Sequence, residues 1–251
     1  MNMDSAVTVV IPCCNEEAAL PLAERALRRL TEAGQPFWTF RYIFVDDGST
    51  DETWSVLQRL FGNRGDCRLL RHPQNRGVTA ACLSGMQAAE TEIVAVIDCD
   101  CTYDPVQLLY LLQELGANTS CVTASPYHPR GRVEDVVWWR LALSRSASRL
   151  YRLILRNGLW TYTSCFRVYR RSHILDLPIA SSGFLGMAEI IAHLVARRRV
   201  VAEVPAVLRA RTVGQSKLRV AKTAIGHAGL LARLAYGRIN FAKSWGKEAN
   251  A

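Results

Sequence analysis

Short apolar runs that end in polar residues recur along the first hundred positions of the chain. Residues 6–11 (AVTVVI), 40–45 (FRYIFV), 67–70 (CRLL) and 93–97 (IVAVI) are such runs. All but the third are rich in the β-branched and aromatic residues that are typical of β-strands. The last run shows no alternation with polar residues. That pattern is typical of a strand that is buried on both faces of a parallel sheet.

Helical patterns separate these predicted strands. Residues 18–33 carry apolar side chains at helical spacing, residues 52–61 follow a Gly-Ser-Thr-Asp turn that can cap a helix, and residues 78–89 are rich in small side chains. The order over residues 6–97 is therefore β-α-β-α-β-α-β. This order predicts an α/β fold with a mostly parallel central sheet flanked by helices.

The second half of the chain gives further predicted elements. Helices are expected over residues 105–115, 133–156 (long and basic), 183–196 and 219–245, and strands over 121–124, 161–169 and 200–208. The chain shows no internal repeat and no low-complexity linker. We therefore expect residues 1–251 to form a single domain.

Three of the predicted strands are followed by polar residues. These are Pro12 to Glu16, Asp46-Asp47 and Asp98 to Asp100. Open α/β sheets bind ligands at the carboxyl ends of their parallel strands, so the three clusters should meet in one crevice. Two carboxylates spaced i, i+2 suit a divalent cation, because Mg²⁺ takes one or two carboxylates and completes its shell with phosphates and water. A lone Asp-x-Asp is more often a solvated turn than a metal site, but three polar strand ends together favour a ligand site.

Charge is divided unevenly between the halves of the chain. Residues 1–124 hold 9 Lys/Arg and 16 Asp/Glu, a net charge of −7, whereas residues 125–251 hold 22 and 6, a net charge of +16. A nucleic acid, a membrane surface or a phosphorylated substrate would each suit the basic half. No Gly-x-Gly-x-x-Gly follows the first strand and no Gly-Lys-Ser/Thr loop is present, which disfavours dinucleotide-binding and P-loop sites.

The cysteines and the apolar segments bear on location. The eight cysteines include no Cys-x-x-Cys pair, and no signal peptide precedes the first strand, so we expect reduced thiols and a cytoplasmic protein. No apolar run reaches the roughly 18–20 residues of a membrane span. Residues 219–245 mix basic and apolar side chains, a pattern that suits either a helix in the membrane interface or one packed on the core.

At this point the motifs resemble a known family. The segments Val10-Ile11-Pro12, Asn15-Glu16, 45–51 (VDDGSTD), Asn75-x-Gly77 and Asp98-Cys99-Asp100 resemble the inverting family 2 glycosyltransferases of GT-A fold. Residues 163–170 (TSCFRVYR) are similar to the Thr-Ser-Gly-Phe-Arg segment of polyprenyl-phosphate (dolichyl-phosphate) mannose synthases. Residues 203–218 resemble a later signature of the same enzymes, so that the resemblance spans roughly residues 6–218.

The resemblance implies a role for each matching residue. The nucleotide sugar would be held by Pro12, Glu16, Asp46, Asp47, Gly77, Asp98 and Cys99. Asp100 would bind Mg²⁺ or Mn²⁺ on the diphosphate. The acceptor phosphate would be gripped by Arg140, Ser144 and Ser216, and the positive charges of Arg211 and Lys217 would act on the leaving diphosphate. Glu189 matches an acidic residue near the transfer site.

These roles predict an inverting, metal-dependent transferase. It would move mannose or glucose from a donor of the GDP-mannose or UDP-glucose type to an anionic lipid, a polyprenyl phosphate, on the cytoplasmic membrane face as a peripheral protein. Residues 1–115 would bind the donor and residues 116–218 the acceptor, followed by a basic amphipathic tail over 219–251.

Several departures from the family pattern leave alternatives open. Thr102, Pro126, Thr161 and Cys165 stand where the lipid-phosphate enzymes have Gln, Arg, Asp and Gly. One alternative is the same chemistry on another lipid or on a hydroxylated acceptor, for which Glu189 would be the general base. Another is a non-catalytic module that binds a nucleotide sugar. Nucleic-acid binding is not expected, because no stacking motif or reader fold is present.

Overall fold

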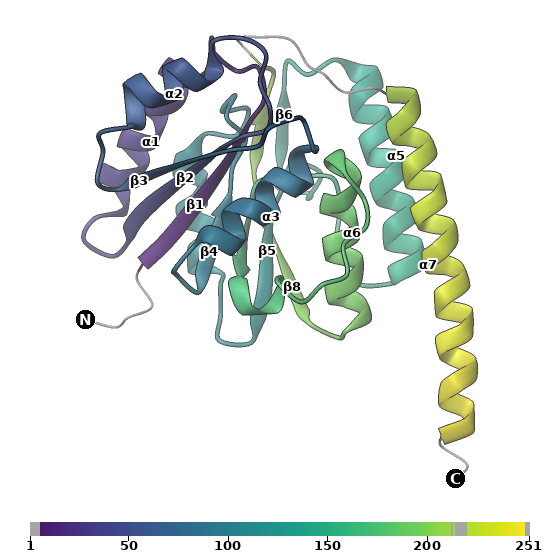
Figure 1. Ribbon diagram of the computed structural model, residues 1–251. Coiled ribbons are helices and arrows are strands. Elements are labelled where there is room, and N and C mark those ends of the chain that lie inside the picture. The colour runs from purple at the N-terminus through teal and green to yellow at the C-terminus, as the bar shows by residue number, and fades with distance from the viewer. Residues whose placement is uncertain (1–5, 212, 214–219, 249–251) are drawn as a thin grey trace.

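A seven-stranded sheet forms the centre of the computed structural model (Figure 1), which describes residues 6–211, 213 and 220–248. Its strands, in spatial order, are β3 (Cys67–Arg71), β2 (Thr39–Asp46), β1 (Ala6–Cys13), β4 (Ile93–Val96), β7 (Arg167–Arg170), β5 (Thr119–Ser125) and β8 (Val200–Pro205). Neighbouring strands are parallel except at β7, which runs antiparallel to both β4 and β5. The predicted α/β fold with a mostly parallel sheet is confirmed.

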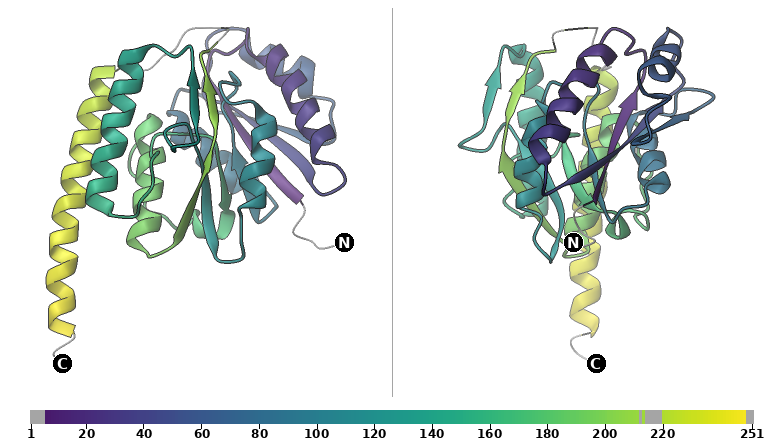
Figure 2. Two further views of the ribbon diagram at one scale, coloured as in Figure 1. Left: turned by 180° about the vertical axis from the view of Figure 1, so that it is seen from behind. Right: turned by 90° about the vertical axis from the view of Figure 1, so that its left-hand side faces the viewer.

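Helices cover both faces of this sheet. They are α1 (Leu20–Gly34), α2 (Thr53–Phe61), α3 (Val78–Ala88), α4 (Leu108–Gln113), α5 (Trp138–Leu155), α6 (Gly183–Ala196) and α7 (Val220–Glu248), with two 3₁₀ turns, η2 (Pro105–Gln107) and η3 (Arg171–His173). Helices α1, α2 and α4 share one hydrophobic core with the sheet, and α3 and α6 share the other with buried residues of α5 and α7. Figures 1 and 2 show α5 and α7 side by side at one end of the molecule.

Burial explains the central elements. All four residues of β4 are buried, which accounts for its continuous apolar run. Helix α1 buries the stripe that contains Leu20, Leu27 and Leu30, and each such leucine stabilises the fold by about 1.5–3 kcal/mol. Gly85 of α3 lies directly against the sheet, because a Cβ there would come within 2.3 Å of Val10 Cγ1. The small residues of α3 therefore bring it close to the sheet, as predicted.

The second half differs from the prediction in three places. The helix expected from residue 133 begins at Trp138, because Arg132–Glu134 form strand β6, which pairs with β9 (Val207–Arg209). The strand expected over 161–169 is reduced to β7, since the preceding amides of Trp160 and Thr161 donate to the Glu203 side chain rather than to a neighbouring strand. The run over 200–208 divides at Ala206 into β8 and β9, which belong to different sheets.

The helix predicted over 219–245 corresponds to α7. Many of its basic side chains lie outside the described residues, so its predicted amphipathic character stays a prediction. Within the described part of the chain, no helix combines the length and apolarity needed to cross a bilayer.

Candidate active site

A cleft of about 1320 Å³ opens at the edge of the sheet where β1, β2 and β4 end. These three strands are parallel neighbours, so their carboxyl ends lie at the same edge. The predicted site residues that line the cleft are Pro12, Glu16, Asp47, Gly77, Asp98, Cys99, Asp100, Arg140 and Arg211. The three polar clusters that were expected to converge therefore do meet in one cavity.

Three carboxylates, those of Glu16, Asp98 and Asp100, line the cleft together with the guanidinium group of Arg211. Arg211 donates to Glu16, and its Nε lies 3.1 Å from Asp100 Oδ2. The other Asp100 oxygen accepts a hydrogen bond of 3.1 Å from the Thr102 amide. Burial and then the charge of Asp100 raise the pKa of Asp98 to about 7. Among the described residues, the carboxylates of this cluster thus carry more negative charge than the Arg211 guanidinium beside them can balance.

This donor set fits a hard divalent cation. Carboxylate oxygens are the ligands that Mg²⁺ and Mn²⁺ prefer, and the surplus negative charge favours a cation. No group of three His, Cys, Asp or Glu side chains in the described ranges is arranged to hold a metal by itself. A cation on Asp100 would therefore need further ligands from a bound phosphate and from water, which is how Mg²⁺ is often held beside nucleotides.

The two adjacent aspartates after β2 have different environments. Asp47 is 2% exposed and lines the cleft, where it accepts hydrogen bonds from the amides of Arg76 (2.9 Å) and Gly77 (2.7 Å). Asp46 is fully buried and does not line the cleft. Its carboxylate lies 3.0 Å from Arg71 Nε and accepts from the Ser49 amide. Its predicted contact with the nucleotide stays a prediction, and its observed contacts shape the strand end from behind.

The predicted acceptor residues are only partly brought together. Arg140 of α5 lines the cleft, with its guanidinium carbon 5.2 Å from the centre of the Trp139 ring. Ser144, one turn later, does not line the cleft, and its hydroxyl lies 2.6 Å from that of Thr163. Ser216 and Lys217 lie outside the described residues.

Glu189 lies behind the cleft wall. It is buried in α6 and accepts hydrogen bonds from the amides of Ala180 (3.2 Å) and Ser181 (2.7 Å), and those two residues line the cleft. Its other carboxylate oxygen is 3.9 Å from an Arg233 nitrogen. These contacts give Glu189 a part in shaping the wall, and its predicted role near the transfer site stays a prediction.

Comparison with protein families identifies the group to which this cleft belongs. The sequence model of the family described as Glycosyl transferase family 2 matches residues 8–177. The chain belongs to glycosyl transferase family 2. The resemblance inferred from the strand-end motifs is thereby confirmed.

Several curated members of this glycosyltransferase family are similar to the chain. A polyprenol monophosphomannose synthase from Mycolicibacterium smegmatis is 27% identical over 84% of the chain and 80% of its own length. An uncharacterized glycosyltransferase from Mycobacterium bovis is 32% identical, over 85% and 89% respectively. A dolichol-phosphate mannosyltransferase from Pyrococcus furiosus is 26% identical over 85% of the chain, which spans 59% of the length of that relative.

Solved structures support the same fold. Glucosyl-3-phosphoglycerate synthase from Mycobacterium tuberculosis, in complex with Mn²⁺, UDP-glucose and phosphoglyceric acid, superposes with a TM-score of 0.70. The two proteins are 19% identical, and the superposition covers 92% of this chain and 80% of the other. The complex of the same synthase with Mg²⁺ and UDP gives a TM-score of 0.69 at 20% identity.

Some cleft residues of this glycosyltransferase were not singled out from the sequence. Asp135 lines the cleft in the left-handed conformation (φ 57°), between β6 and α5. His72 contacts Asp47 from behind the cleft wall, with its Nδ1 2.7 Å from the carboxylate. The position of His72, directly after a strand and just before Asn75-x-Gly77, was a signal that sequence reasoning did not use.

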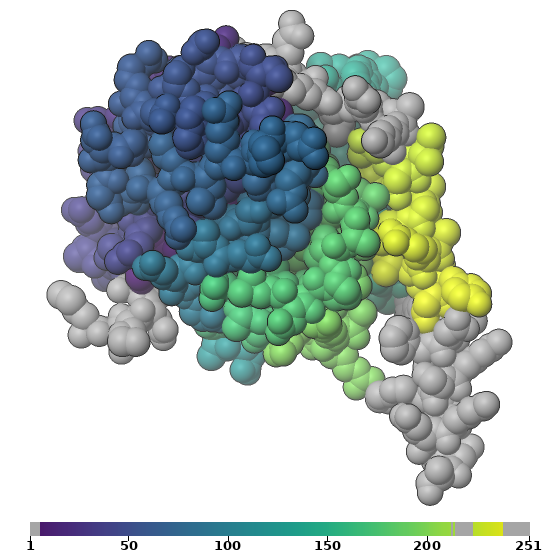
Figure 3. Space-filling view, in the orientation of Figure 1, coloured from purple at the N-terminus to yellow at the C-terminus, as the bar shows by residue number. Residues whose placement is uncertain are grey.

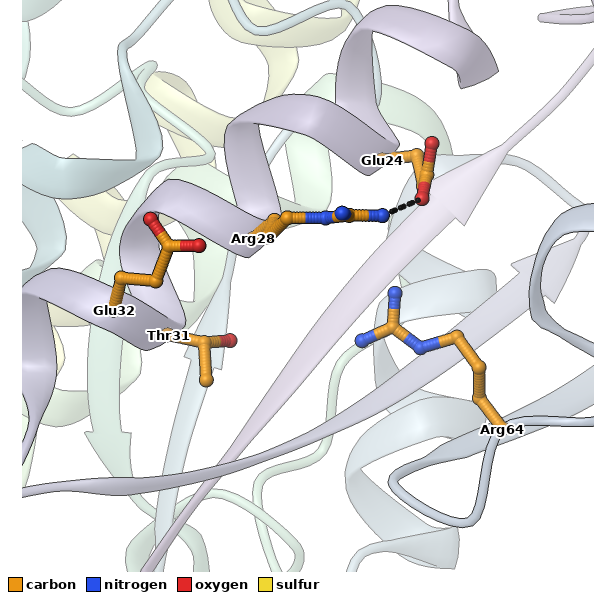
Figure 4. A pocket seen from close by; sticks show the side chains of 5 residues that line it. All are labelled: Glu24, Arg28, Thr31, Glu32 and Arg64. Atoms are coloured by element: carbon orange, nitrogen blue, oxygen red, sulfur yellow. Dashed lines mark hydrogen bonds and ion pairs between the residues drawn. The ribbon is translucent and has the colours of Figure 1, made fainter.

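A second, smaller hollow lies elsewhere on the surface (Figure 4). It has a volume of about 360 Å³ and is lined by Glu24, Arg28, Thr31, Glu32 and Arg64. Arg28 and Glu24 form an ion pair of 3.0 Å across one side of it. None of the predicted site residues that the structure describes lines this hollow, and it shares no lining residue with the cleft at the strand ends.

Proposed function

We propose that the chain is an inverting glycosyltransferase that moves a hexose from a nucleoside diphosphate sugar to the phosphate of a polyprenyl phosphate. The observation that carries this proposal is the meeting of Glu16, Asp98 and Asp100 with two arginines, Arg140 and Arg211, in one cleft. The donor would be of the GDP-mannose or UDP-glucose type. Support comes from the mannose synthases among the relatives and from the UDP-glucose complex of the structural neighbour.

The donor end of the cleft suits departure of a nucleoside diphosphate. Asp100 would hold Mg²⁺ or Mn²⁺, which when bound stabilises the negative charge that develops on the leaving diphosphate. Arg211 already lies against Asp100 and Glu16. A short rotation of its side chain would direct the same guanidinium at phosphate oxygens, which it can bind in a bidentate manner. The chain thus keeps a second positive group beside the reacting diphosphate.

The acceptor end of the cleft suits an anion. The Nε of Arg140 is buried without a hydrogen-bond partner within the described ranges, so an acceptor oxygen would relieve the cost of that unpaired donor. A phosphate is already ionised at neutral pH and therefore needs orientation rather than a general base. A hydroxyl acceptor would need a base, and Glu189 instead binds the amides of Ala180 and Ser181. The contacts of both residues favour a phosphate acceptor.

The exposed faces of α5 and α7, two helices that also contribute to the cleft lining, suit a lipid bilayer. Helix α5, which carries Arg140, exposes Trp138 (77%) and Leu153 (70%), and α7 beside it exposes Ile225. In the sequence of α5, the exposed Arg145 and Arg149 stand between Trp138 and Leu153. Apolar side chains with basic neighbours suit the interface of an anionic membrane. We propose that this surface brings the cleft to the cytoplasmic membrane face, with the chain as a peripheral protein.

The function is tested by a labelled-sugar transfer assay. GDP-mannose and UDP-glucose are each offered with Mn²⁺ to a polyprenyl phosphate and to the corresponding polyprenol. Transfer to the phosphate alone supports the proposal, and transfer to the polyprenol alone supports the hydroxyl-acceptor alternative. If nucleotide binds, as seen by a rise in melting temperature, but no sugar is transferred to any acceptor, the chain is a binding module and the proposal is wrong.

A further inference from the structure

The wall of the cleft beside Asp47 is a loop that has no regular secondary structure. We call residues Asn75, Arg76 and Gly77 the donor loop; all three line the cleft. The amides of Arg76 and Gly77 both donate to the Asp47 carboxylate, at 2.9 and 2.7 Å. The Asn75 side chain donates to Cys14 Sγ at 3.1 Å, on the segment that follows β1. The position of this loop therefore depends on a few polar contacts rather than on a helix or strand.

The Asp47 carboxylate is itself held by a buried histidine. His72 is 8% exposed, its Nδ1 lies 2.7 Å from Asp47 Oδ1, and its Nε2 lies 3.0 Å from Ser84 Oγ on α3. An ionised carboxylate can only accept, so Nδ1 must be the donor of the first bond. The ring is thus fixed at both ends, and it orients the same oxygen that accepts from the Arg76 amide.

Backbone packing holds the other end of the donor loop. Gly77 has a φ of 94°, in the region that favours glycine, and a Cβ there would lie 2.8 Å from the Gly183 amide nitrogen. The loop therefore has no room to move toward the start of α6. With that side closed, the hydrogen bonds to Asp47 fix the direction of the Arg76 and Gly77 amides.

We infer that His72 is a positioning residue that acts through Asp47 to hold the donor loop at the nucleotide end of the cleft. Three donors already occupy the Asp47 carboxylate, which is 2% exposed, so its main effect on a donor substrate is exerted through the loop. The inference rests on the proposed function, because the loop's substrate is the nucleotide sugar. A wall that contacts the nucleotide equally before and during transfer alters KM rather than kcat.

Three substitutions separate positioning from bulk stability. His72→Gln removes the N–H at the position of Nδ1, because the amide nitrogen of Gln is one bond further from Cα. His72→Asn keeps this donor, because the amide nitrogen of Asn is as many bonds from Cα as Nδ1 of His. Ser84→Ala removes only the hydrogen bond at Nε2. We expect His72→Gln to raise the KM for the nucleotide sugar roughly 10- to 100-fold, the usual cost of losing a partner that orients a ligating group. The kcat should change by less than about twofold. His72→Asn should restore most of the affinity, and Ser84→Ala should have the smallest effect.

A second measurement does not depend on catalysis. Hydrogen exchange of the Arg76 and Gly77 amides in the ligand-free protein should be faster in His72→Gln than in wild type, and close to wild type in His72→Asn. If the exchange responds in this way but wild type binds neither UDP nor GDP with Mn²⁺, the proposed function is wrong and the positioning role stands. If His72→Gln and His72→Asn match each other in exchange and in KM, or if only kcat falls, His72 does not position the loop.

Discussion

Two walls of the cleft differ in how their charged groups are held. On the proposed function, the wall formed by Asp47 and residues 75–77 faces the donor (the donor wall), and the wall formed by Arg140 of α5 faces the acceptor (the acceptor wall). On the donor wall, Asp47 is buried at a strand end and binds the backbone amides of Arg76 and Gly77, and Asp46 binds the Ser49 amide behind that wall. On the acceptor wall, Arg140 projects from α5, a helix whose only fully buried residues in the structure as described are Ser148 and Tyr151. In Figure 3 the first half of the chain (purple to blue) forms one continuous area. Helix α7 (yellow) is separated from that area by α6 (green).

This difference indicates what each wall can change. A carboxylate held by backbone amides cannot be moved without altering the sheet edge, so the donor wall is preorganised by the fold. An exposed helix tolerates substitution on its outer face, since surface changes usually alter stability by less than about 0.5 kcal/mol. The acceptor wall can therefore vary between relatives while the donor wall keeps its geometry.

The donor wall should be the more sensitive of the two. Asp100→Asn removes the negative charge that would hold the cation, and transfer should fall by at least about 100-fold, as when a preorganised electrostatic group is lost. The matched control is Asp104→Asn, the same change four positions later at a residue that does not line the cleft and that pairs with Arg29. Initial rates at saturating Mn²⁺ measure the effect. Equal losses in the two variants would contradict the assignment of Asp100.

The acceptor wall should respond in acceptor affinity alone. Arg140→Ala removes a hydrogen bond to a charged group, worth about 1.5–3 kcal/mol, so the KM for polyprenyl phosphate should rise roughly 10- to 100-fold. The KM for the nucleotide sugar should stay unchanged. Arg145→Ala is the control, because Arg145 lies on the same helix but stacks 5.2 Å from the Tyr127 ring outside the cleft. If the KM for the nucleotide sugar rises instead, Arg140 acts on the donor and its assignment to the acceptor wall is wrong.

Arg211 lies at the donor end of the cleft, between Glu16 and Asp100, and its removal should lower the stability of the fold. In Arg211→Ala the carboxylates of Glu16 and Asp100 lose a partner that is largely buried with them. We expect the metal-free protein to lose about 1–3 kcal/mol of unfolding free energy, a few degrees in melting temperature. Mn²⁺ should restore part of that loss, because a cation replaces the missing charge. Differential scanning fluorimetry with and without Mn²⁺ measures this, and a variant that Mn²⁺ leaves unchanged would exclude a cation site at Asp100.

A pH dependence of stability is expected from Asp98. Its pKa is raised to about 7 from the ordinary 3.8, so between these values the folded protein binds more protons than the unfolded chain. Stability should therefore fall as pH rises from about 4 to 7 and level off above that. The melting temperature of metal-free Asp98→Asn, compared with wild type at about pH 5 and about pH 8, isolates this contribution. The melting temperature of the variant relative to that of wild type should be higher at the higher pH. A difference in melting temperature that does not change with pH would show that the Asp98 carboxyl does not titrate in this range.

The convergence of the strand ends at the donor wall could be predicted from the sequence, whereas the contacts between distant segments could not. The runs before Pro12, Asp46 and Asp98 are apolar and long enough to predict strands, and parallel pairing then brings their ends to one edge. Which of Asp46 and Asp47 faces the cleft could not be read, because adjacent residues at a strand end point in opposite directions and either could be the inner one.

Contacts between segments that are far apart in the chain could not be predicted from the sequence. Arg211 meets Glu16 across 195 positions, and no local pattern encodes that approach. Strand β6 is three residues long and polar, and it forms only because β9 supplies its partner some 75 positions later. The basic helix was consequently predicted to begin at residue 133, whereas α5 begins at Trp138; the rest of the helix was predicted correctly.

The reversed direction of β7 has a consequence for how such a cleft can diversify. A strand that runs against its neighbours brings its beginning, not its end, to the edge where the others finish. Residues 161–166, which lead into Arg167, thus arrive beside Asp98 from the opposite direction, and Cys165 donates a hydrogen bond to that carboxylate. Insertions just ahead of this strand would remodel the sugar's surroundings while every carboxylate at the other strand ends stayed in register.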